Sequence, residues 1–318
     1  MTVLLWGVPS EGPVALVAEA LGRLQVDVVV LHPRAADGTS AALGLGPGPA
    51  GGGVLTGWLQ LPGRRVALAG LRGAYVRPVE PELMPEFARL PPTSPRRVHA
   101  RLLHDTMVAF TEVAGVVTGC RVANRLSAMA SNISKPYQAQ AVRRHGFSTP
   151  ATLITSDPDA VLEFVARHRR VVYKSISGVR SIVTAYDGAV DRARLGRLRW
   201  CPVQFQEQVC GPDVRVHVVG EDVFAAVVDS DAVDYRYARA QVGRDARLRA
   251  HRLPDDVAAR CVALAADLDL PFAGVDLKLA PDGRVFCFEV NPSPGFSWYE
   301  QEAGLPISAA LARWLAGR

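Results

Sequence analysis

The sequence predicts an α/β protein with a parallel α/β domain at its N-terminus and a mixture of helices and antiparallel strands in the remainder. Two short apolar segments, Val3–Gly7 and Asp27–Leu31, flank a helix-compatible segment, Pro13–Leu24. A strand–helix–strand order within ~30 residues is typical of parallel sheets. Further along the chain, pairs of apolar segments are separated by short turns that contain glycine, which indicates hairpins.

Composition limits the classes of protein to consider. The 318 residues are 49% hydrophobic and 21% charged, as in ordinary soluble domains, and two or three domains are expected. The five cysteines form no CxxC or CxxxC pair, which argues against a zinc site and a disulfide framework and favours a reducing cytoplasm. The N-terminus does not resemble a signal peptide, and no apolar run of ~18 residues predicts a membrane span.

The net charge of +5 comes from scattered arginines that are mixed with acidic residues. Such a distribution does not favour nucleic acid as a partner. It suits a nucleotide or an acidic peptide better.

The rest of the N-terminal part is predicted from apolar runs and from Gly/Pro content. Residues Gly38–Gly57 are rich in Gly, Pro and Ala and are expected to form a loop. Gly44-Leu45-Gly46 matches part of a dinucleotide fingerprint, but it follows no clear strand, so the loop interpretation is preferred. Apolar runs occur at Val66–Leu71 and Ala74–Val76, an irregular Pro-rich segment at Pro78–Pro95, and a long helix at Arg97–Val117.

From Ser134 onward, helices and strands alternate more clearly. Predicted helices cover Lys135–His145, Ala160–Arg167, Pro254–Leu268 and Ser308–Ala316, with Asp157 as an N-cap and Gly146 at a C-terminus. Predicted strands cover Thr149–Ile154, Val171–Ser175, Val203–Val209, Val214–Val219, Val223–Asp229, Gly274–Ala280 and Val285–Val290.

The last predicted hairpin carries the strongest chemical signal. Asp276 lies on one strand, and Glu289 and Asn291 lie on the next, on one face because strand side chains alternate. If the turn at Pro281–Gly283 pairs the strands, Asp276 lies opposite this pair. Two carboxylates and one amide supply the oxygen ligands that magnesium prefers. An ordinary acidic surface hairpin would contain similar residues, but Glu-Val-Asn-Pro-Ser-Pro-Gly stiffens the chain beside the proposed ligands in a way such a hairpin does not need.

Two further segments can bind an anionic ligand. Lys174 ends a buried strand and precedes a Ser/Gly turn with Ser177, Gly178 and Arg180, where a lysine and backbone N–H groups can contact phosphate. A hairpin that ends in a solvated lysine explains this segment equally well.

Residues 204–209 (QFQEQV) form the second segment, a strand that leads toward Asp213 and Arg215. Its backbone can contact a purine, Asp213 can accept hydrogen bonds from ribose, and Arg215 can stabilise a transferring phosphate. Lys135 and Arg236 are ambiguous when each is considered alone.

Taken in order, these residues resemble the ATP-grasp superfamily of ligases over about residues 125–318. The similarity is greatest to the branch of the ribosomal-protein S6 glutamate ligase and to the macrocyclases of graspetides, which are omega-ester-containing peptides. Residues 149–158 (TPATLITSDP), Gly295–Glu300 and Gly304–Ile307 carry the resemblance to the macrocyclases. It implies a three-domain fold, with nucleotide between the central and C-terminal domains. The boundaries are 1–125 for an N-terminal α/β domain, 126–205 for the central part and 206–318 for the C-terminal part.

The resemblance also implies a role for each matching residue. Phosphate contacts are implied for Lys135, Lys174 and the turn with Ser177, Gly178 and Arg180, which has one glycine where the family has a glycine-rich loop. Gln206, Glu207, Gln208 and Val209 would hold adenine, and Asp213 would bind ribose. Arg215 and Arg236 would stabilise an acyl phosphate and its transition state, and Asp276, Glu289 and Asn291 would bind two Mg²⁺ ions, with Mn²⁺ as an alternative.

The implied reaction activates a carboxylate with ATP and transfers the acyl group to an amine or a hydroxyl. Three alternatives stay open at this point. The chain modifies a ribosomal peptide, joins amino acids or similar metabolites, or binds nucleotide without catalysis. The complete set of charged residues argues against the last, because unpaired buried charges destabilise a protein. By analogy with related ligases, a homodimer is expected.

Overall fold

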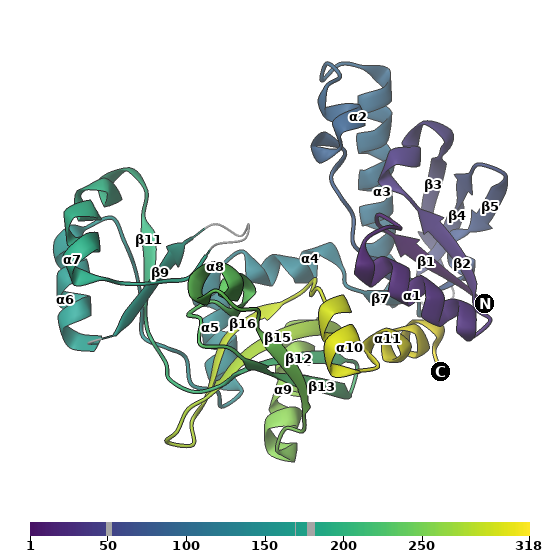
Figure 1. Ribbon diagram of the computed structural model, residues 1–318. Coiled ribbons are helices and arrows are strands. Elements are labelled where there is room, and N and C mark those ends of the chain that lie inside the picture. Colours follow the sequence, from purple (N-terminus) through teal and green to yellow (C-terminus); the bar gives the residue numbers. More distant parts are fainter. Residues whose placement is uncertain (49–52, 169, 177–181) are drawn as a thin grey trace.

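The computed structural model describes residues 1–48, 53–168, 170–176 and 182–318, and these form four sheets with helices packed against them (Figure 1). The order of elements is that of an α/β protein, with one parallel sheet near the N-terminus and antiparallel sheets elsewhere. The predicted fold class is therefore confirmed.

The first sheet is parallel, with strand order β2-β1-β6-β7. Its strands are β1 (Thr2–Trp6), β2 (Asp27–Leu31), β6 (Leu71–Val76) and β7 (Arg121–Ala123). Helix α1 (Gly12–Arg23) joins β1 to β2, as predicted. Val3 and Leu5 pack in one core with α1, whereas Leu4 and Trp6 pack in another with α3 (Pro95–Val117). Burial on both faces explains why these strands are continuous apolar runs.

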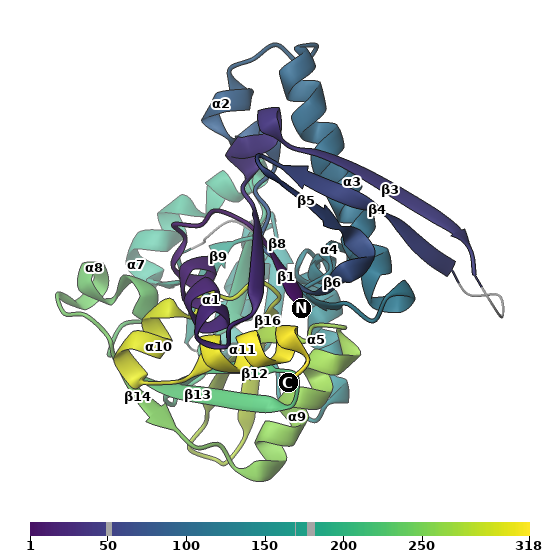
Figure 2. The same ribbon diagram turned by 90° about the vertical axis from the view of Figure 1, so that its right-hand side faces the viewer.

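The segment predicted as a loop at Gly38–Gly57 is instead largely a hairpin. Strands β3 (Ser40–Pro47) and β4 (Gly53–Leu61) pair antiparallel, and β5 (Arg64–Ala67) adds a third strand to this projecting sheet (Figure 2). The loop prediction was wrong because cross-strand pairing overrides local composition. One glycine is needed in the ladder itself: Gly57 has φ +124°, and a Cβ there would overlap the Ala42 carbonyl oxygen.

The central sheet is antiparallel, with strand order β10-β9-β11-β8. Its strands are β8 (Thr152–Thr155), β9 (Val171–Ser175), β10 (Thr184–Ala185) and β11 (Val203–Glu207). Helices α6 (Pro158–His168) and α7 (Gly188–Asp191) and a 3₁₀ helix at Arg192–Trp200 accompany it. Tyr173 and Phe205 pack against the core beneath these helices, so alternation directs Lys174 to the opposite face.

The C-terminal sheet is antiparallel, with strand order β14-β13-β12-β15-β16. Its strands are β12 (Asp213–Val219), β13 (Asp222–Asp229), β14 (Arg247–His251), β15 (Phe272–Leu279) and β16 (Val285–Asn291). Helices α5 (Lys135–Arg144) and α9 (Asp255–Asp267) cover one face, where Val216, Val275 and Val290 are buried. The other face carries the polar residues considered below.

The remaining helices are short and were mostly not predicted. They are α2 (Pro85–Ala88), α4 (Leu126–Met129), α8 (Ala238–Val242), α10 (Ser297–Ala303) and α11 (Ile307–Ala316). Helix α11 packs beside α1, and its Leu311 and Leu315 join the core of the N-terminal sheet (Figure 1). The end of the chain therefore completes the first domain, and the boundaries after residues 125 and 205 stay proposals.

Asn124 connects the N-terminal sheet to the C-terminal one. It directly follows β7 and is 1% exposed. Its Nδ2 donates to the carbonyl oxygens of Phe272 and Pro292, each at 2.5 Å, and its Oδ1 accepts from the Phe272 N–H at 3.1 Å. Because the site is buried, no water can replace these bonds at low cost.

We predict that Asn124→Ala lowers the free energy of unfolding by about 3 kcal/mol, because buried backbone groups of Phe272 and Pro292 lose their partners. Urea unfolding measures the change. The control Gln301→Ala removes an exposed amide from α10 and should stay within about 0.5 kcal/mol of the parent chain. A loss below about 1 kcal/mol for Asn124→Ala would contradict this role.

Candidate active site

Three charged side chains form a row across neighbouring strands of the C-terminal sheet. Asp276 of β15 pairs with Arg215 of β12 on one side and with Glu289 of β16 on the other. Asn291 lies opposite Gly274, two residues along the same ladder. This is the arrangement predicted from the turn at Pro281–Gly283.

A β-bulge sets the direction of Glu289. The register shifts between Asp276 and Leu277, so that Asp276 pairs with Glu289 but Leu277 pairs with Cys287. Cys287 is buried in the core under α5 and α9. Strict alternation would put Cys287 and Glu289 on the same face, and the extra residue lets the thiol enter the core while the carboxylate stays on the polar face.

Arg215 and Asp276 form a buried ion pair. Arg215 Nη1 donates to Asp276 Oδ1 at 2.6 Å, and Arg215 is 6% exposed. Burial by itself would lower the pKa of Arg215, but the Asp276 charge outweighs it and raises that pKa above its ordinary value. Glycine is required at position 274, because a Cβ there would overlap the guanidinium. Asp276 therefore keeps Arg215 charged, and the missing side chain of Gly274 leaves room for the guanidinium.

Glu289 is paired with Lys135, which opens α5. Lys135 Nζ donates to Glu289 Oε2 at 2.9 Å and to Asn132 Oδ1 at 2.6 Å. The Gln138 amide holds α5 against β16 by donating to the Val290 carbonyl at 2.7 Å and accepting from the Val290 N–H at 2.9 Å. Burial would raise the pKa of Glu289, but Lys135 and Lys174 outweigh this effect and hold it below its ordinary value. The carboxylate is thus ionised at neutral pH.

Lys174 approaches the same carboxylate from the central sheet. Burial lowers its pKa, and the Glu289 charge opposes that shift. Among the described residues, Lys174 makes no hydrogen bond or ion pair. A half-buried ammonium group without a partner is a ready contact for an anionic ligand.

Arg236 lies in a short 3₁₀ helix, Tyr235–Tyr237, close enough to Asp276 for that charge to raise its pKa. Its guanidinium donates to Asp234 from Nε at 2.8 Å and from Nη2 at 2.7 Å, and this bonding raises its pKa. Tyr235, the residue before it, shares a hydrogen bond with Tyr299 of α10 at 2.9 Å between the hydroxyl oxygens. This hydrogen bond connects the segment that carries Arg236 to α10, the helix that follows β16.

The proposed nucleotide contacts occupy the adjoining strands. Asp213 pairs with Lys278 at 2.9 Å, and burial raises its pKa in spite of this lysine. Gln206 Nε2 donates to Thr152 Oγ1 at 2.9 Å, and the Glu207 carboxylate accepts from the Ala151 N–H at 3.0 Å.

Gln208 and Val209 follow β11. The Gln208 N–H donates to the Arg170 carbonyl oxygen at 3.0 Å, and Val209 is buried. Ser177, Gly178 and Arg180 lie outside the described residues.

Comparison with known proteins decides the family. Residues 134–315, more than half of the chain, match the RimK-like ATP-grasp domain. The chain belongs to the RimK-like ATP-grasp family. A relative, the ribosomal protein bS6–L-glutamate ligase of Shigella flexneri serotype 5b (strain 8401), is 25% identical over 201 residues, 60% of this chain and 66% of that protein. The chain spans 61% and 66% of the lengths of the first curated relatives that it matches.

Solved structures resemble the whole chain. Macrocyclase MdnC of Microcystis aeruginosa MRC, bound with precursor peptide MdnA, has a TM-score of 0.78 at 21% identity, with 100% of both chains covered. The ATP-grasp ligase PsnB, complexed with a phosphomimetic variant of its minimal precursor, Mg and ADP, has a TM-score of 0.75 at 26% identity, with 99% of this chain and 97% of that one covered. By family and by fold, the chain is an ATP-grasp protein, and the predicted resemblance is confirmed.

The oxygen ligands fit Mg²⁺ in an open ATP-grasp site. The described residues hold no group of three or more His, Cys, Asp or Glu side chains suited to a metal ion. Asp276, Glu289 and Asn291 contribute only two carboxylates and one amide, which suits an ion that keeps water and phosphate oxygens as further ligands. Asn291 Oδ1 accepts from the Ser293 N–H at 3.0 Å, so one of its two lone pairs stays available.

Several residues of this ATP-grasp site were not predicted from the sequence. His217, fully buried on β12, packs its ring against Tyr299 with 5.0 Å between centroids, and its Nε2 lies 3.4 Å from the Gly295 carbonyl oxygen. Burial and the Arg215 charge hold the pKa of His217 well below its ordinary value, so it is neutral. Alternation from Arg215 could have placed it on this face, and alternation from Asp276 could have placed Lys278 there, whereas Tyr235 and Gln138 carry no such local signal.

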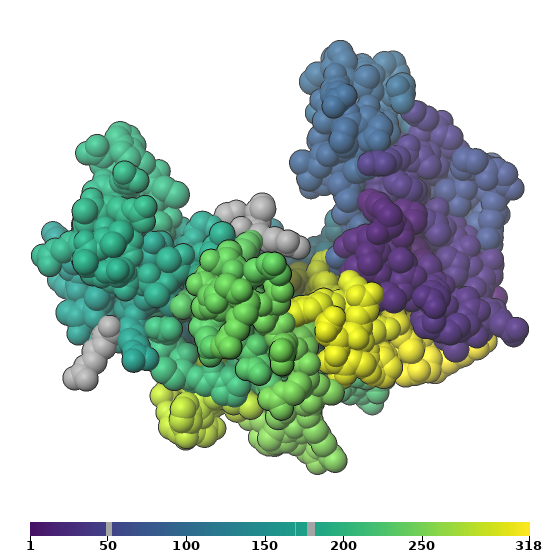
Figure 3. Space-filling model, in the orientation of Figure 1, coloured from purple at the N-terminus to yellow at the C-terminus, as the bar shows by residue number. Residues whose placement is uncertain are grey.

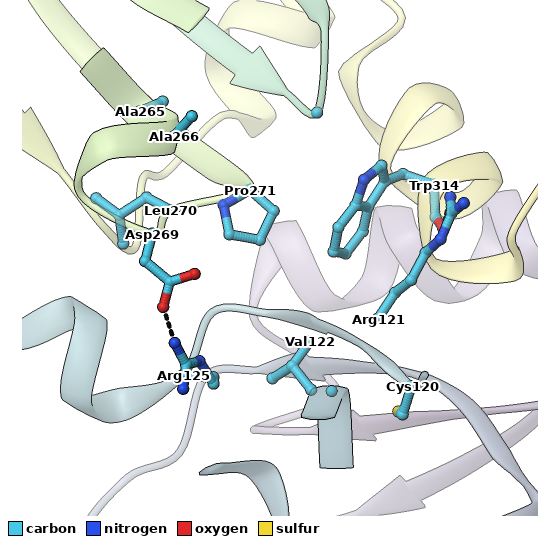
Figure 4. A pocket seen from close by; sticks show the side chains of 12 residues that line it. Cys120, Arg121, Val122, Arg125, Ala265, Ala266, Asp269, Leu270, Pro271 and Trp314 are labelled. Carbon is cyan, nitrogen blue, oxygen red and sulfur yellow. Dashed lines mark hydrogen bonds and ion pairs between the residues drawn. The ribbon is translucent and has the colours of Figure 1, made fainter. Parts of the chain in front are cut away.

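The described residues also line a cavity away from this row. It measures 430 Å³ and lies among Arg121, Arg125, Asp269 and Trp314, at the junction of the N-terminal sheet with α9 and α11 (Figure 4). Arg125 pairs with Asp269 across it, and Arg121 donates to the Trp314 carbonyl oxygen at 2.9 Å. The cavity lining contains a single carboxylate, Asp269, which is paired with Arg125, so we assign the chemistry to the carboxylate row.

No helix among the described residues is long and apolar enough to cross a membrane.

We predict that Lys174→Met stabilises the ligand-free ATP-grasp fold by about 1 kcal/mol at pH 7, because it removes a half-buried charge that has no hydrogen-bond or ion-pair partner among the described residues. The pKa of Lys174 is lowered in the folded state, so the parent chain gains stability as pH rises from that value to 10.5, the ordinary value for lysine. The advantage of the variant should therefore shrink toward pH 10.5 in urea unfolding.

Lys278→Met is the matched control, because Lys278 is paired with Asp213. This change should destabilise the protein, since it leaves a buried carboxylate without its cation. If the two substitutions change the free energy of unfolding equally, the lack of an ion-pair partner does not distinguish Lys174 from Lys278.

Proposed function

We propose that this chain activates a carboxylate with ATP and Mg²⁺ and joins it to a side-chain hydroxyl or amine of a ribosomally made peptide. The observation that carries the proposal is the convergence of Lys135, Lys174 and Arg215 on Asp276 and Glu289 from helix α5 and two different sheets. Cations and oxygen ligands on rigid strands are what phosphoryl transfer requires, because its catalysis is mainly positioning and charge neutralisation.

Each group has a part in this proposal. Asp276, Glu289 and Asn291 hold Mg²⁺, which when bound neutralises charge on the transferring phosphoryl group. Lys135 and Lys174 contact the ATP phosphates. Their proximity to Glu289 follows from the ion pair at 2.9 Å and from the mutual charge effects on pKa.

The nucleoside and the acyl group are placed by further residues. Asp213 binds ribose, and Gln206 to Val209 hold adenine, where the central sheet meets the C-terminal one. Arg215 and Arg236 bind the acyl phosphate, since both stay charged beside Asp276 and both are planar donors suited to phosphate.

The reaction proceeds in two steps. A substrate carboxylate oxygen attacks the γ-phosphorus of ATP, and ADP leaves, which gives an acyl phosphate. The amine or hydroxyl then attacks the acyl carbon, loses its proton, and releases phosphate. The product has lost one water for each ester or amide formed. Figure 3 shows an open hollow between the N-terminal and central parts of the chain. Water must be kept from the acyl phosphate once substrate is bound, because water would hydrolyse it.

The peptide substrate is supported by the extent of the likeness. MdnC and PsnB, whose structures contain precursor peptides, match this chain over nearly its whole length, including the N-terminal domain. The glutamate ligase matches over 60% of it. A ligase that joins amino acids or small metabolites is the second candidate, because the curated relatives are glutamate ligases. A second metal ion, use of Mn²⁺, a homodimer and a cytoplasmic location stay predictions.

We predict that ATP consumption rises when the chain is given precursor-like peptides rich in Thr or Ser and Asp or Glu, and that each product loses the mass of one or more waters. Mass spectrometry of the peptide and an ADP assay measure the two effects. ATP consumption only with free amino acids would support the small-metabolite ligase. No consumption with any acceptor would instead support a nucleotide-binding module without catalysis.

We predict that Glu289→Ala lowers the peptide-dependent rate at least about 100-fold, because a metal ligand and the partner of Lys135 are lost together. Glu163→Ala is the matched control, since Glu163 is exposed on α6, and it should retain the parent rate. An unchanged rate in Glu289→Ala would refute the assignment of the site.

A further inference from the structure

The loop after β16, residues 292–296, is held by an arginine from the N-terminal sheet. Arg77 directly follows β6, and its Nη1 donates to Ser293 Oγ at 2.8 Å and to the Pro294 carbonyl oxygen at 3.2 Å. Its Nε donates to Glu11 at 3.0 Å, and the side chain is 12% exposed. Charge-assisted bonds from a buried guanidinium fix geometry as well as contributing energy. Arg77 therefore sets the position of this loop.

The same loop contains the hydrogen bond that orients Asn291. The Ser293 N–H donates to Asn291 Oδ1 at 3.0 Å. Only one lone pair of this oxygen is used, and the direction of the other is determined by where Ser293 lies. A displacement of Ser293 would therefore turn the amide oxygen of Asn291 relative to Asp276 and Glu289.

A second contact restrains the first residue of the loop. Asn124, at the end of the neighbouring strand β7, donates to the Pro292 carbonyl oxygen at 2.5 Å. Arg77 and Asn124 thus act from the carboxyl ends of adjacent parallel strands, the edge at which open α/β sheets place functional groups. The N-terminal domain reaches the metal ligands through this loop.

We propose that Arg77 is a positioning residue for the metal site, which fixes Ser293 and Pro294 so that the Ser293 N–H holds Asn291 Oδ1 in place for the ion. This inference rests on the proposed function, because it takes Asn291 as a metal ligand. Hydrogen bonds one step removed from a metal change its affinity about 10–100-fold. Arg77 itself touches neither the ion nor the substrate.

The test measures Mn²⁺ binding by electron paramagnetic resonance, with the full chain saturated with ADP and Mn²⁺ used in place of Mg²⁺. Arg77→Ala should raise the Kd for Mn²⁺ about tenfold, and Asn291→Ala should raise it at least as much. Arg77→Lys should restore part of the affinity, because lysine can keep one of the two loop contacts. Arg72→Ala is the matched control, since Arg72 is an exposed arginine on the same strand, and its Kd should equal that of the parent chain.

Affinity for ADP without metal distinguishes positioning from general damage to the fold. Positioning predicts that Arg77→Ala leaves this affinity unchanged, whereas a weakening of ADP binding by the same factor as Mn²⁺ binding overturns the inference. If Arg77→Ala does not fold, Ser293→Ala decides, because it removes the hydroxyl that accepts from Arg77 and keeps the N–H. Its Kd for Mn²⁺ should rise severalfold, and an unchanged Kd overturns the inference.

Failure of the inference and failure of the proposed site give different results. If Arg77→Ala binds Mn²⁺ like the parent chain while Asn291→Ala binds it weakly, Arg77 has no positioning role and the metal site stands. If Asn291→Ala and Glu289→Gln also bind Mn²⁺ like the parent chain, the metal site itself is wrong and the inference falls with it.

Discussion

Two ion pairs on one face of the C-terminal sheet, Arg215–Asp276 and Lys135–Glu289, are the constraint around which the site is built. Charges of either sign would be costly to bury alone, and each pair removes part of that cost. The two pairs lie side by side, because Asp276 and Glu289 are partners on neighbouring strands, and Lys174 is close enough to affect the pKa of Glu289. A nucleotide with Mg²⁺ can bind among these groups, because its phosphates can replace the carboxylates as partners of the cations and Mg²⁺ can replace the cations as partner of the carboxylates.

Three parts of the chain must be in place for this face to form. Helix α5 brings Lys135 because Gln138 binds the backbone of Val290 at the edge of β16. The central sheet brings Lys174, and the N-terminal sheet holds the loop after Asn291 through Arg77 and Asn124. Helix α11 then returns to pack on α1, so the two ends of the chain share one core. The N-terminal and C-terminal sheets are therefore connected at residues 292–294 as well as through the linkers between them.

The N-terminal domain consequently has two kinds of contact in the proposed reaction. Its sheet edge holds residues 292–294 through Arg77 and Asn124, and its surface borders an open hollow (Figure 3). The likeness to peptide-bound ligases over nearly the whole chain fits a domain of this kind, since substrate would meet the domain on the way to the carboxylate row. The projecting β3–β4 hairpin has no part in these contacts among the described residues, and the site gives no account of it.

The sequence by itself determined that Asp276 lies opposite Glu289 and that Asn291 shares the face of Glu289, because a short turn joins the strands and side-chain alternation is a local rule. It also determined the family, through the order of residues between Lys135 and Asn291. Local composition failed at Ser40–Pro47, where pairing with β4 outweighed glycine content. Only the tertiary structure decided that Cys287 enters the core at a bulge, and that Arg77 and Asn124 contact a loop more than 160 positions away. Such contacts depend on how the sheets pack together, and the residues next to each contact in the sequence carry no pattern that predicts this packing.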